Sequence, residues 1–141
     1  MVGKAARPRT LARVAAELAV LARELRHAEH GLWLNSRPKA SGVADLLPVV
    51  TAKGPSFRTR REPLPLLVIA ALEDIYRRGQ LRRGCPDLAI WRTDREDFRL
   101  VEVKCPDWDK PSLDQERFIQ IASQVGISTK IVEWVFAEDA A

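Results

Sequence analysis

The chain has 141 residues, of which 46% are hydrophobic and 30% charged, and it carries a net charge of +4 with a sequence pI of about 9.4. This length suits one modest core, so we expect a single domain over residues 1–141. Two cysteines are too few for a disulfide framework, no apolar run could span a membrane, and charges interrupt the N-terminal segment where a signal peptide needs an apolar core. The sequence therefore predicts a cytoplasmic protein, and its basic balance hints at a polyanionic partner.

The first half of the chain predicts one long helix followed by an irregular segment. Apolar residues recur at the i, i+3, i+4, i+7 spacing of one buried stripe, which predicts a helix over 9–29. Residues 30–63 are rich in Gly and Pro, so we expect mostly short turns there. Within them LWLN (32–35) or LLPVVT (46–51) could form a strand, and Pro48 would confine the second to an edge or a bulge.

The second half of the chain predicts alternating helices and strands. The expected elements are a helix over 64–78, strands over 86–91 and 98–104, a helix over 113–125 and a last strand over 129–136. The first of these helices is apolar almost all round and ends in arginines, which favours a largely buried helix with a basic last turn. The order of the elements predicts a small mixed sheet covered by helices, an α/β sandwich.

The two strands of the predicted hairpin bring two acids face to face. A turn centred between Asp94 and Arg95 pairs Asp87 with Glu102. Directly opposed residues have Cβ atoms roughly 4.5–5.5 Å apart, and at about 4 Å two carboxylates repel by about 4 kcal/mol at an effective dielectric constant near 20. A proton on one acid, or a hard divalent cation between them, would relieve this repulsion. Lys104 lies on the same face, where its ammonium group could offset negative charge, contact a phosphate or polarise a water.

An exposed charged pair is the ordinary interpretation of a Glu-x-Lys pattern on a strand. Here Leu100, Val101 and Val103 favour a central strand, where a Glu and a Lys need a specific reason. Gln115 also has an ordinary explanation, because Ser-Leu-Asp-Gln (112–115) is an S-x-x-Q capping box at a helix start.

Three segments of this region together resemble the VRR-NUC domain of the PD-(D/E)XK nuclease superfamily. They are GCPDLAIW (84–91), LVEVKCP (100–106) and SLDQ (112–115). The family pattern is G-x-P-D-L, a hairpin, E-V-K-G-P and a Gln opening the next helix, and the C-terminal nuclease domain of the Fanconi-associated nuclease is similar over the same span. The resemblance covers residues 82–135 and departs from the pattern at Cys105, where Gly is usual. It implies a restriction-endonuclease-like sandwich whose motif-bearing core spans residues 82–136.

The resemblance implies a role for each matching residue. Asp87 and Glu102 match the metal-binding acids, and the main-chain carbonyl of Val103 commonly completes that metal shell. Lys104 matches the catalytic lysine, and Gln115 matches the glutamine of the following helix. The implied cofactor is Mg²⁺ or Mn²⁺. The family's first helix often supplies another acid near the metal, and the open alternatives for it are Glu17, Glu24, Glu29 and Glu73.

Basic and aromatic side chains near these motifs are candidates for DNA binding. They are Arg77, Arg78, Arg82, Arg83 and Trp108. Glu73 and Asp74 stand four residues before Arg77 and Arg78, so these two arginines could simply form helix ion pairs. Arg82 and Arg83 lack such partners, and for them we prefer phosphate contact. Trp108 follows the lysine in a polar loop and could stack on a base.

These expectations predict a metal-dependent, structure-specific DNA endonuclease that acts on branched DNA such as Holliday junctions. Stand-alone members of the family resemble junction resolvases, which implies a homodimer whose two-fold symmetry supplies two sites for two strands. Two alternatives stay open: a flap or restriction-type nuclease of the same chemistry, and a non-catalytic nucleic-acid-binding module. The acid pair argues against the module, because a pure binder has no need of opposed acids.

Overall fold

The computed structural model describes residues 2–34, 41–94, 96–106, 108–110 and 112–135. The elements within these ranges are α1 (Val2–Glu24), β1 (Glu29–Trp33), β2 (Ser41–Thr51), β3 (Gly54–Pro63), α2 (Leu66–Gly79), β4 (Leu88–Arg92), β5 (Phe98–Lys104), α3 (Leu113–Gln124) and β6 (Thr129–Glu133). In the described part of the chain, no helix combines the length and the apolar character that crossing a membrane requires.

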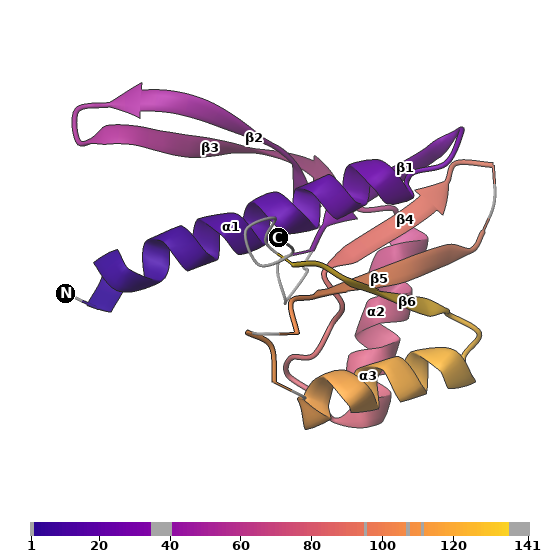
Figure 1. The fold of residues 1–141 in the computed structure, drawn as a ribbon. Helices are drawn as coiled ribbons and strands as arrows, with labels where there is room; N and C mark the ends of the chain where they lie inside the picture. The colour runs from indigo at the N-terminus through magenta and orange to yellow at the C-terminus, as the bar shows by residue number, and fades with distance from the viewer. Residues whose placement is uncertain (1, 35–40, 95, 107, 111, 136–141) are drawn as a thin grey trace.

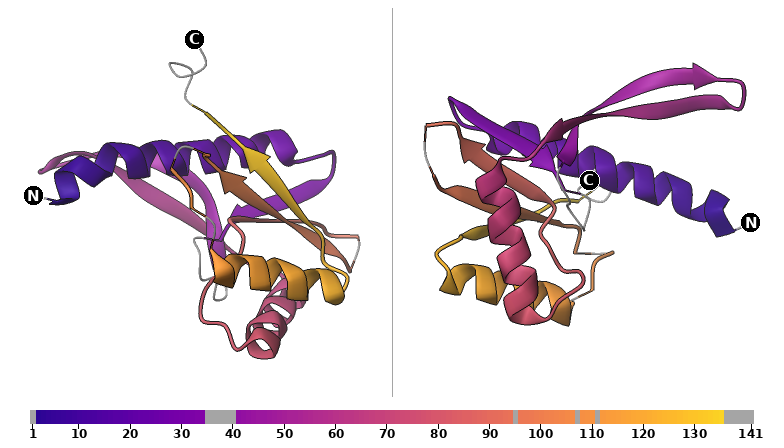
Figure 2. Two further views of the ribbon diagram at one scale, coloured as in Figure 1. Left: turned by 60° about the horizontal axis from the view of Figure 1, so that its bottom comes forward. Right: turned by 180° about the vertical axis from the view of Figure 1, so that it is seen from behind.

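The strands form one mixed sheet in the order β3-β2-β1-β4-β5-β6. Neighbouring strands are antiparallel, except that β5 and β6 are parallel and are connected through α3. The helix α1 runs across one face of the sheet, and α2 and α3 lie on the other (Figures 1 and 2). The predicted mixed sheet flanked by helices is confirmed.

The alternation of side chains along the central strands fills two separate cores. Ala89 and Leu100 face α2 and α3, where they belong to one cluster with the fully buried Phe118. The residues of the opposite parity face α1 and form a second cluster, made of Val20, Leu21, Leu88, Ile90, Val101 and Val103. Each buried aliphatic side chain contributes about 1.5–3 kcal/mol relative to exposure, so both layers hold the sheet.

The register of the β4–β5 hairpin is the predicted one. The pairs are Leu88 with Val101, Ala89 with Leu100, Ile90 with Arg99 and Trp91 with Phe98. Since a slip of one residue would turn every core side chain to the wrong face, the two buried faces fix this register. β4 begins at Leu88, two residues later than expected, and the predicted end of the last strand at Phe136 lies outside the described residues.

The first half of the chain departs most from the expectation. The helix expected over 9–29 instead spans Val2–Glu24, so both predicted ends are wrong. Ala28 has a φ of 65°, a left-handed conformation that cannot continue a right-handed helix, and Glu29 then begins β1. Between residues 30 and 63, which we expected to be mostly turns, the described ranges 30–33, 41–51 and 54–63 lie in strands. The candidate strand at 46–51 falls within β2, and the one at 32–35 overlaps the end of β1.

β2 and β3 form a long hairpin that projects beyond the body of the molecule (Figure 1). β2 pairs with β1 only through Val43 and Trp33, and a register irregularity follows between Val43 and Asp45. Beyond that point β2 and β3 pair only with each other. We call this two-stranded ribbon, residues 45–60, the β-arm. Pro48 lies within it, where the missing N–H breaks no bond to a third strand.

Candidate active site at the end of the sheet

Asp87 is fixed at the end of the sheet where β4 begins and the antiparallel β5 ends. Its main-chain carbonyl accepts a hydrogen bond from the Leu34 N–H (2.7 Å), and its side-chain Oδ2 accepts one from the Val103 N–H (2.8 Å). These two bonds tie the residue to β1 on one side and to β5 on the other. The carboxyl group is thereby directed at the last residues of β5.

Glu102 meets Asp87 across the strands, as the register predicts. The two carboxyl groups lie within hydrogen-bonding range of each other. Glu102 is only 3% exposed, and burial together with the charge of Asp87 raises the pKa of Glu102 to about 10. Burial also raises the pKa of Asp87. The Oε2 atom of Glu102 is buried and has no hydrogen-bond partner among the described residues, which is rare for a carboxylate oxygen.

Glu17 is the helix acid that the structure brings to this pair. It is 5% exposed, and its carboxyl group lies within hydrogen-bonding range of Asp87 and of the Trp33 side chain. Burial, followed by the nearby charge of Asp87, raises the pKa of Glu17 to about 8. In the described ranges no three His, Cys, Asp or Glu side chains form a ready-made metal cluster. Glu17 therefore adjoins Asp87 without completing a three-acid cluster among the described residues.

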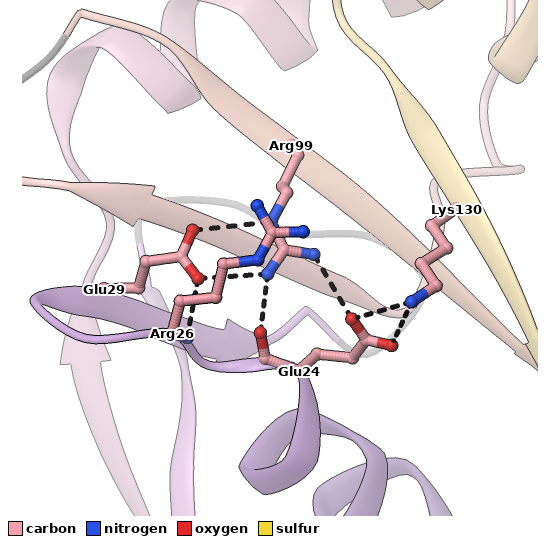
Figure 3. A network of polar contacts seen from close by, with 5 residues as sticks. All are labelled: Glu24, Arg26, Glu29, Arg99 and Lys130. Atoms are coloured by element: carbon pink, nitrogen blue, oxygen red, sulfur yellow. Dashed lines mark hydrogen bonds and ion pairs between the residues drawn. The ribbon is translucent and has the colours of Figure 1, made fainter.

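Glu24, at the C-terminal end of α1, and Glu29, at the start of β1, belong to a separate polar network (Figure 3). Arg99 contacts Glu29 at 3.1 Å, and Lys130 contacts Glu24 at 2.8 Å. The hydrogen bond from Lys130 is the main cause that lowers the pKa of Glu24. Burial alone would raise the pKa of Glu29, but the hydrogen bonds from Arg99 and from the Arg26 N–H outweigh burial and lower it. Arg99 lies five positions before Lys104 on β5, roughly 16 Å away along the strand.

Glu73, the fourth alternative, is exposed on α2. Its expected ion pair with Arg77 is replaced by one between Arg77 and Asp74, which also binds Arg78 (2.7 Å). Of the four helix acids, the structure therefore places one, Glu17, beside the acid pair.

Lys104 ends β5 and donates a hydrogen bond from Nζ to the side-chain oxygen of Gln115. Its charge also acts on the carboxyl groups of Asp87 and Glu102 and opposes the rise in their pKa values. Gln115 lies in the first turn of α3, where its N–H donates to Oγ of the N-cap Ser112 (3.4 Å). The N–H of Gln115 is thus part of the helix cap, while its side chain contacts the lysine.

These residues line a cavity of about 270 Å³ between the end of β5, β6 and the start of α3. Glu102, Lys104 and Gln115 form part of its wall, together with Lys110 and Glu133. A larger hollow of about 640 Å³ lies between α1 and the base of the β-arm, and it is lined by none of the predicted catalytic residues. The smaller cavity is therefore the one that could receive a substrate group beside the acids.

Gly84 explains why the loop before Asp87 can reach α3. Its φ is 113°, and a Cβ at this position would lie 2.5 Å from the main-chain oxygen of Asp114. Only glycine allows this approach without a backbone shift. The loop and the first turn of α3 are consequently in contact, which brings the segments bearing Asp87 and Gln115 together.

The loop after Lys104 is held by contacts that the sequence analysis missed. The Cys105 N–H donates to Oδ2 of Asp109 (2.6 Å), and the same carboxylate pairs with Arg13 of α1 (2.8 Å). Cys105, which replaces the usual Gly of the motif, is 1% exposed. No sequence pattern links Arg13 with Asp109, because they are distant in the chain and meet only after α1 packs on the sheet.

The residues predicted to bind DNA have mixed environments. Arg83, expected to lack an acidic partner, forms an ion pair with Asp114 (2.9 Å), although its side chain remains 81% exposed. Arg82 is exposed and makes no ion pair within the described ranges. Trp108 packs edge-to-face on Trp134, with ring centroids 5.4 Å apart, instead of standing free in the loop. The arginine cluster thus remains accessible, whereas the tryptophan is partly covered.

A mixed sheet between helical layers, with opposed acids and a lysine at the strand ends, is the architecture of a PD-(D/E)XK nuclease domain. Residues 56–133, more than half of the chain, match the VRR-NUC domain, and the chain belongs to this family. The resemblance inferred from the sequence is therefore confirmed.

A solved structure, that of paFAN1 bound to a 5′-flap DNA with a gap, is similar at 26% sequence identity with a TM-score of 0.38. The match covers 50% of this chain and 13% of that one, so the chain corresponds to a small part of that protein. The search of curated proteins found no match.

Proposed function

We propose that residues 1–141 form a single nuclease domain that hydrolyses DNA phosphodiester bonds with the help of a divalent cation. The observation that carries this proposal is the pairing of the half-buried Asp87 with the buried Glu102 next to the amine of Lys104. Two carboxyl groups that face each other, one of them buried, destabilise a fold unless protons or a cation compensate them. Glu102 and Lys104 also line the cavity, which favours a chemical role for the pair.

The donor set fits a hard cation, Mg²⁺ or Mn²⁺. Asp87 and Glu102 would hold it through carboxylate oxygens, with the main-chain carbonyl of Val103 as the third protein donor. The buried, unpartnered Oε2 of Glu102 supports this fit, because a cation would satisfy it. A cation bound there would polarise the phosphodiester and lower the pKa of the attacking water.

The neighbouring side chains would complete the chemistry. The Lys104 ammonium would stabilise negative charge that develops on the phosphate, and Gln115 would keep that ammonium directed at the cavity. Glu17 would support Asp87 and hold a proton beside it. We count Asp87, Glu102, Lys104 and Gln115 as the proposed catalytic set and Glu17 as a positioning residue.

The proposed substrate is branched or otherwise structured DNA, above all Holliday junctions. The proposed location is the cytoplasm. Arg82 and Arg83 would contact phosphates next to the site, Arg77 and Arg78 would extend that basic surface, and Trp108 would line it. A homodimer would supply one site for each of two strands. The family resemblance supports this choice of substrate.

Labelled four-way junctions, flaps and plain duplex, each incubated with Mg²⁺ or with EDTA, test the activity. We expect cleavage of the branched substrates in Mg²⁺ and none in EDTA. Lys104→Ala should lower the cleavage rate by about 10²–10³-fold, the usual cost of one charge-stabilising group. Lys130→Ala serves as a matched control, since Lys130 pairs with Glu24 away from the cavity.

Cleavage that persists in EDTA or in the Lys104 variant would refute the mechanism. Binding without cleavage would instead favour a nucleic-acid-binding module. Light scattering at the assay concentration tests the assembly, and a monomer there would contradict the proposed homodimer.

A further inference from the structure

The outer part of the β-arm carries exposed apolar side chains on both faces. Leu47 on one face is 42% exposed, and Val50 on the other is 90% exposed. The register places Leu47 opposite Arg58 and Val50 opposite Pro55, in the outer part of the arm, whereas Asp45 and Arg60 at its base line a hollow shared with α1. Isolated two-stranded hairpins are only marginally stable in water, so a ribbon that leaves the body is expected to gain order from a partner.

The charge of the β-arm identifies the chemistry of that partner. The arm carries three basic residues, Lys53, Arg58 and Arg60, and one acid, Asp45. Arg60 pairs with Glu62 (3.2 Å), whereas Lys53 and Arg58 make no ion pair within the described residues. The outer half of the arm therefore presents unneutralised positive charge, which is complementary to a polyanion.

The shape of the β-arm matches a nucleic-acid duplex. The strand from 45 to 51 extends about 23 Å at the rise of a β-strand, and the major groove of B-DNA, about 12 Å wide and 8.5 Å deep, admits a two-stranded ribbon. In Figures 1 and 2 the arm leaves the body on the side where β4 begins and β5 ends, which is the side of the acid pair. A duplex held by the arm would thus lie on the side of the cavity.

We infer that the β-arm is a second DNA-binding element that enters the major groove of the duplex next to the cleaved bond, with Lys53 and Arg58 against its phosphates. This inference rests on the proposed function, because it assumes a DNA substrate. It adds a contact that is separate from Arg82 and Arg83, which belong to the loop before β4.

Fluorescence anisotropy of a labelled duplex, and of one of its single strands, measured in EDTA across a salt series, tests the inference. In the double variant Lys53→Gln/Arg58→Gln we expect the slope of log affinity against log salt to fall in magnitude by about 1.8 for the duplex, because each lost phosphate contact removes about 0.9. Single-strand binding should change far less, since a single strand offers no groove.

Arg23→Gln/Arg26→Gln is the matched control, because it removes the same charge from exposed residues at the far end of α1. Its duplex slope should equal that of the wild type. A second variant, in which Asn-Gly replaces residues 47–58 to make a tight turn, should lose the same duplex contribution while its thermal unfolding stays cooperative.

Three outcomes would overturn the inference. Wild-type protein that binds no DNA would reject the proposed function and this inference with it. Wild-type binding with an unchanged slope in both arm variants would reject the arm alone. A dimer lost in the arm variants without any change in duplex affinity would assign the β-arm to a second copy of the chain.

Discussion

Gln115 combines two interactions that mutation can separate. Its N–H is capped by Ser112, while its side chain accepts the Lys104 ammonium. We expect Gln115→Leu to lower kcat about tenfold or more with little change in stability, because the ammonium loses the group that orients it. Ser112→Ala should instead lower the free energy of unfolding by about 1 kcal/mol and leave kcat nearly unchanged. Cleavage kinetics and urea unfolding of both variants check this pair, and equal effects on kcat would contradict it.

At the scale of elements, Gly84 sets the contact between the loop before β4 and α3. Gly84→Ala forces the loop away from the Asp114 carbonyl, so we expect a loss of about 1–3 kcal/mol in stability and a slower cleavage rate. Gly54→Ala is the control, because Gly54 has a similar φ of 110° but nothing within 4 Å of the added Cβ. Thermal unfolding and cleavage rates distinguish the two. Identical rates in both variants would show that the loop does not position Asp87.

The network around Arg99 joins α1, β1 and β5. Arg99 and Glu29 are largely covered, with side-chain exposures of 17% and 10%. Arg99→Met should lower the free energy of unfolding by about 1–3 kcal/mol, because it removes the guanidinium that contacts the covered carboxylates of Glu24 and Glu29. Arg83→Met breaks an exposed pair and should cost at most about 1 kcal/mol. Denaturant titration compares them, and a larger loss for Arg83 would contradict this ranking.

The pH dependence of that difference follows from the lowered pKa values of Glu24 and Glu29. A lowered carboxylate pKa contributes stability above its ordinary range, and this contribution is lost as the pH falls through the folded-state pKa. The wild type and Arg99→Met should therefore converge in acid.

For the molecule as a whole, the raised pKa values of the site acids predict how its free energy of unfolding depends on pH and on metal. The pKa values of Glu17 and Glu102 rise from 4.5 to about 8 and about 10. Above pH 4.5 the unfolded chain releases these protons while the folded, metal-free protein keeps them, so its stability falls as the pH rises until those folded-state values are passed.

Differential scanning fluorimetry in EDTA should accordingly give a Tm that decreases from weakly acidic to alkaline pH. Mg²⁺ should raise the Tm most at the alkaline end, because the cation replaces the protons. In Glu102→Gln both the pH slope and the Mg²⁺ effect should shrink. A Tm that rises with pH in EDTA would show that the acids are not protonated in the folded protein.

The sequence was enough to predict the site where side-chain alternation and strand pairing leave one register. The positions of Asp87, Glu102 and Lys104 followed from the parity of β4 and β5, because both faces of those strands are buried. The β-arm could not be predicted in the same way, since a ribbon exposed on both faces needs no apolar alternation.

Glu17 was only one of four alternatives, although a signal was present in the sequence. Val20 and Leu21, three and four residues later, are buried apolar residues of α1 and place Glu17 on the packed face of the helix. Glu29 was an alternative because the expected helix reached residue 29, whereas α1 ends at Glu24 and the chain turns at Ala28.

The reactivity of the two thiols can report how often this end of the sheet opens. Cys85 and Cys105 are 3% and 1% exposed, and burial raises the pKa of the Cys85 thiol above its usual range. We expect an alkylating reagent to reach either sulfur only when the segments around Asp87 and Lys104 move apart. The alkylation rate of the native protein would thus measure the frequency of this opening. Bound Mg²⁺ would lower that rate if it holds the two segments together.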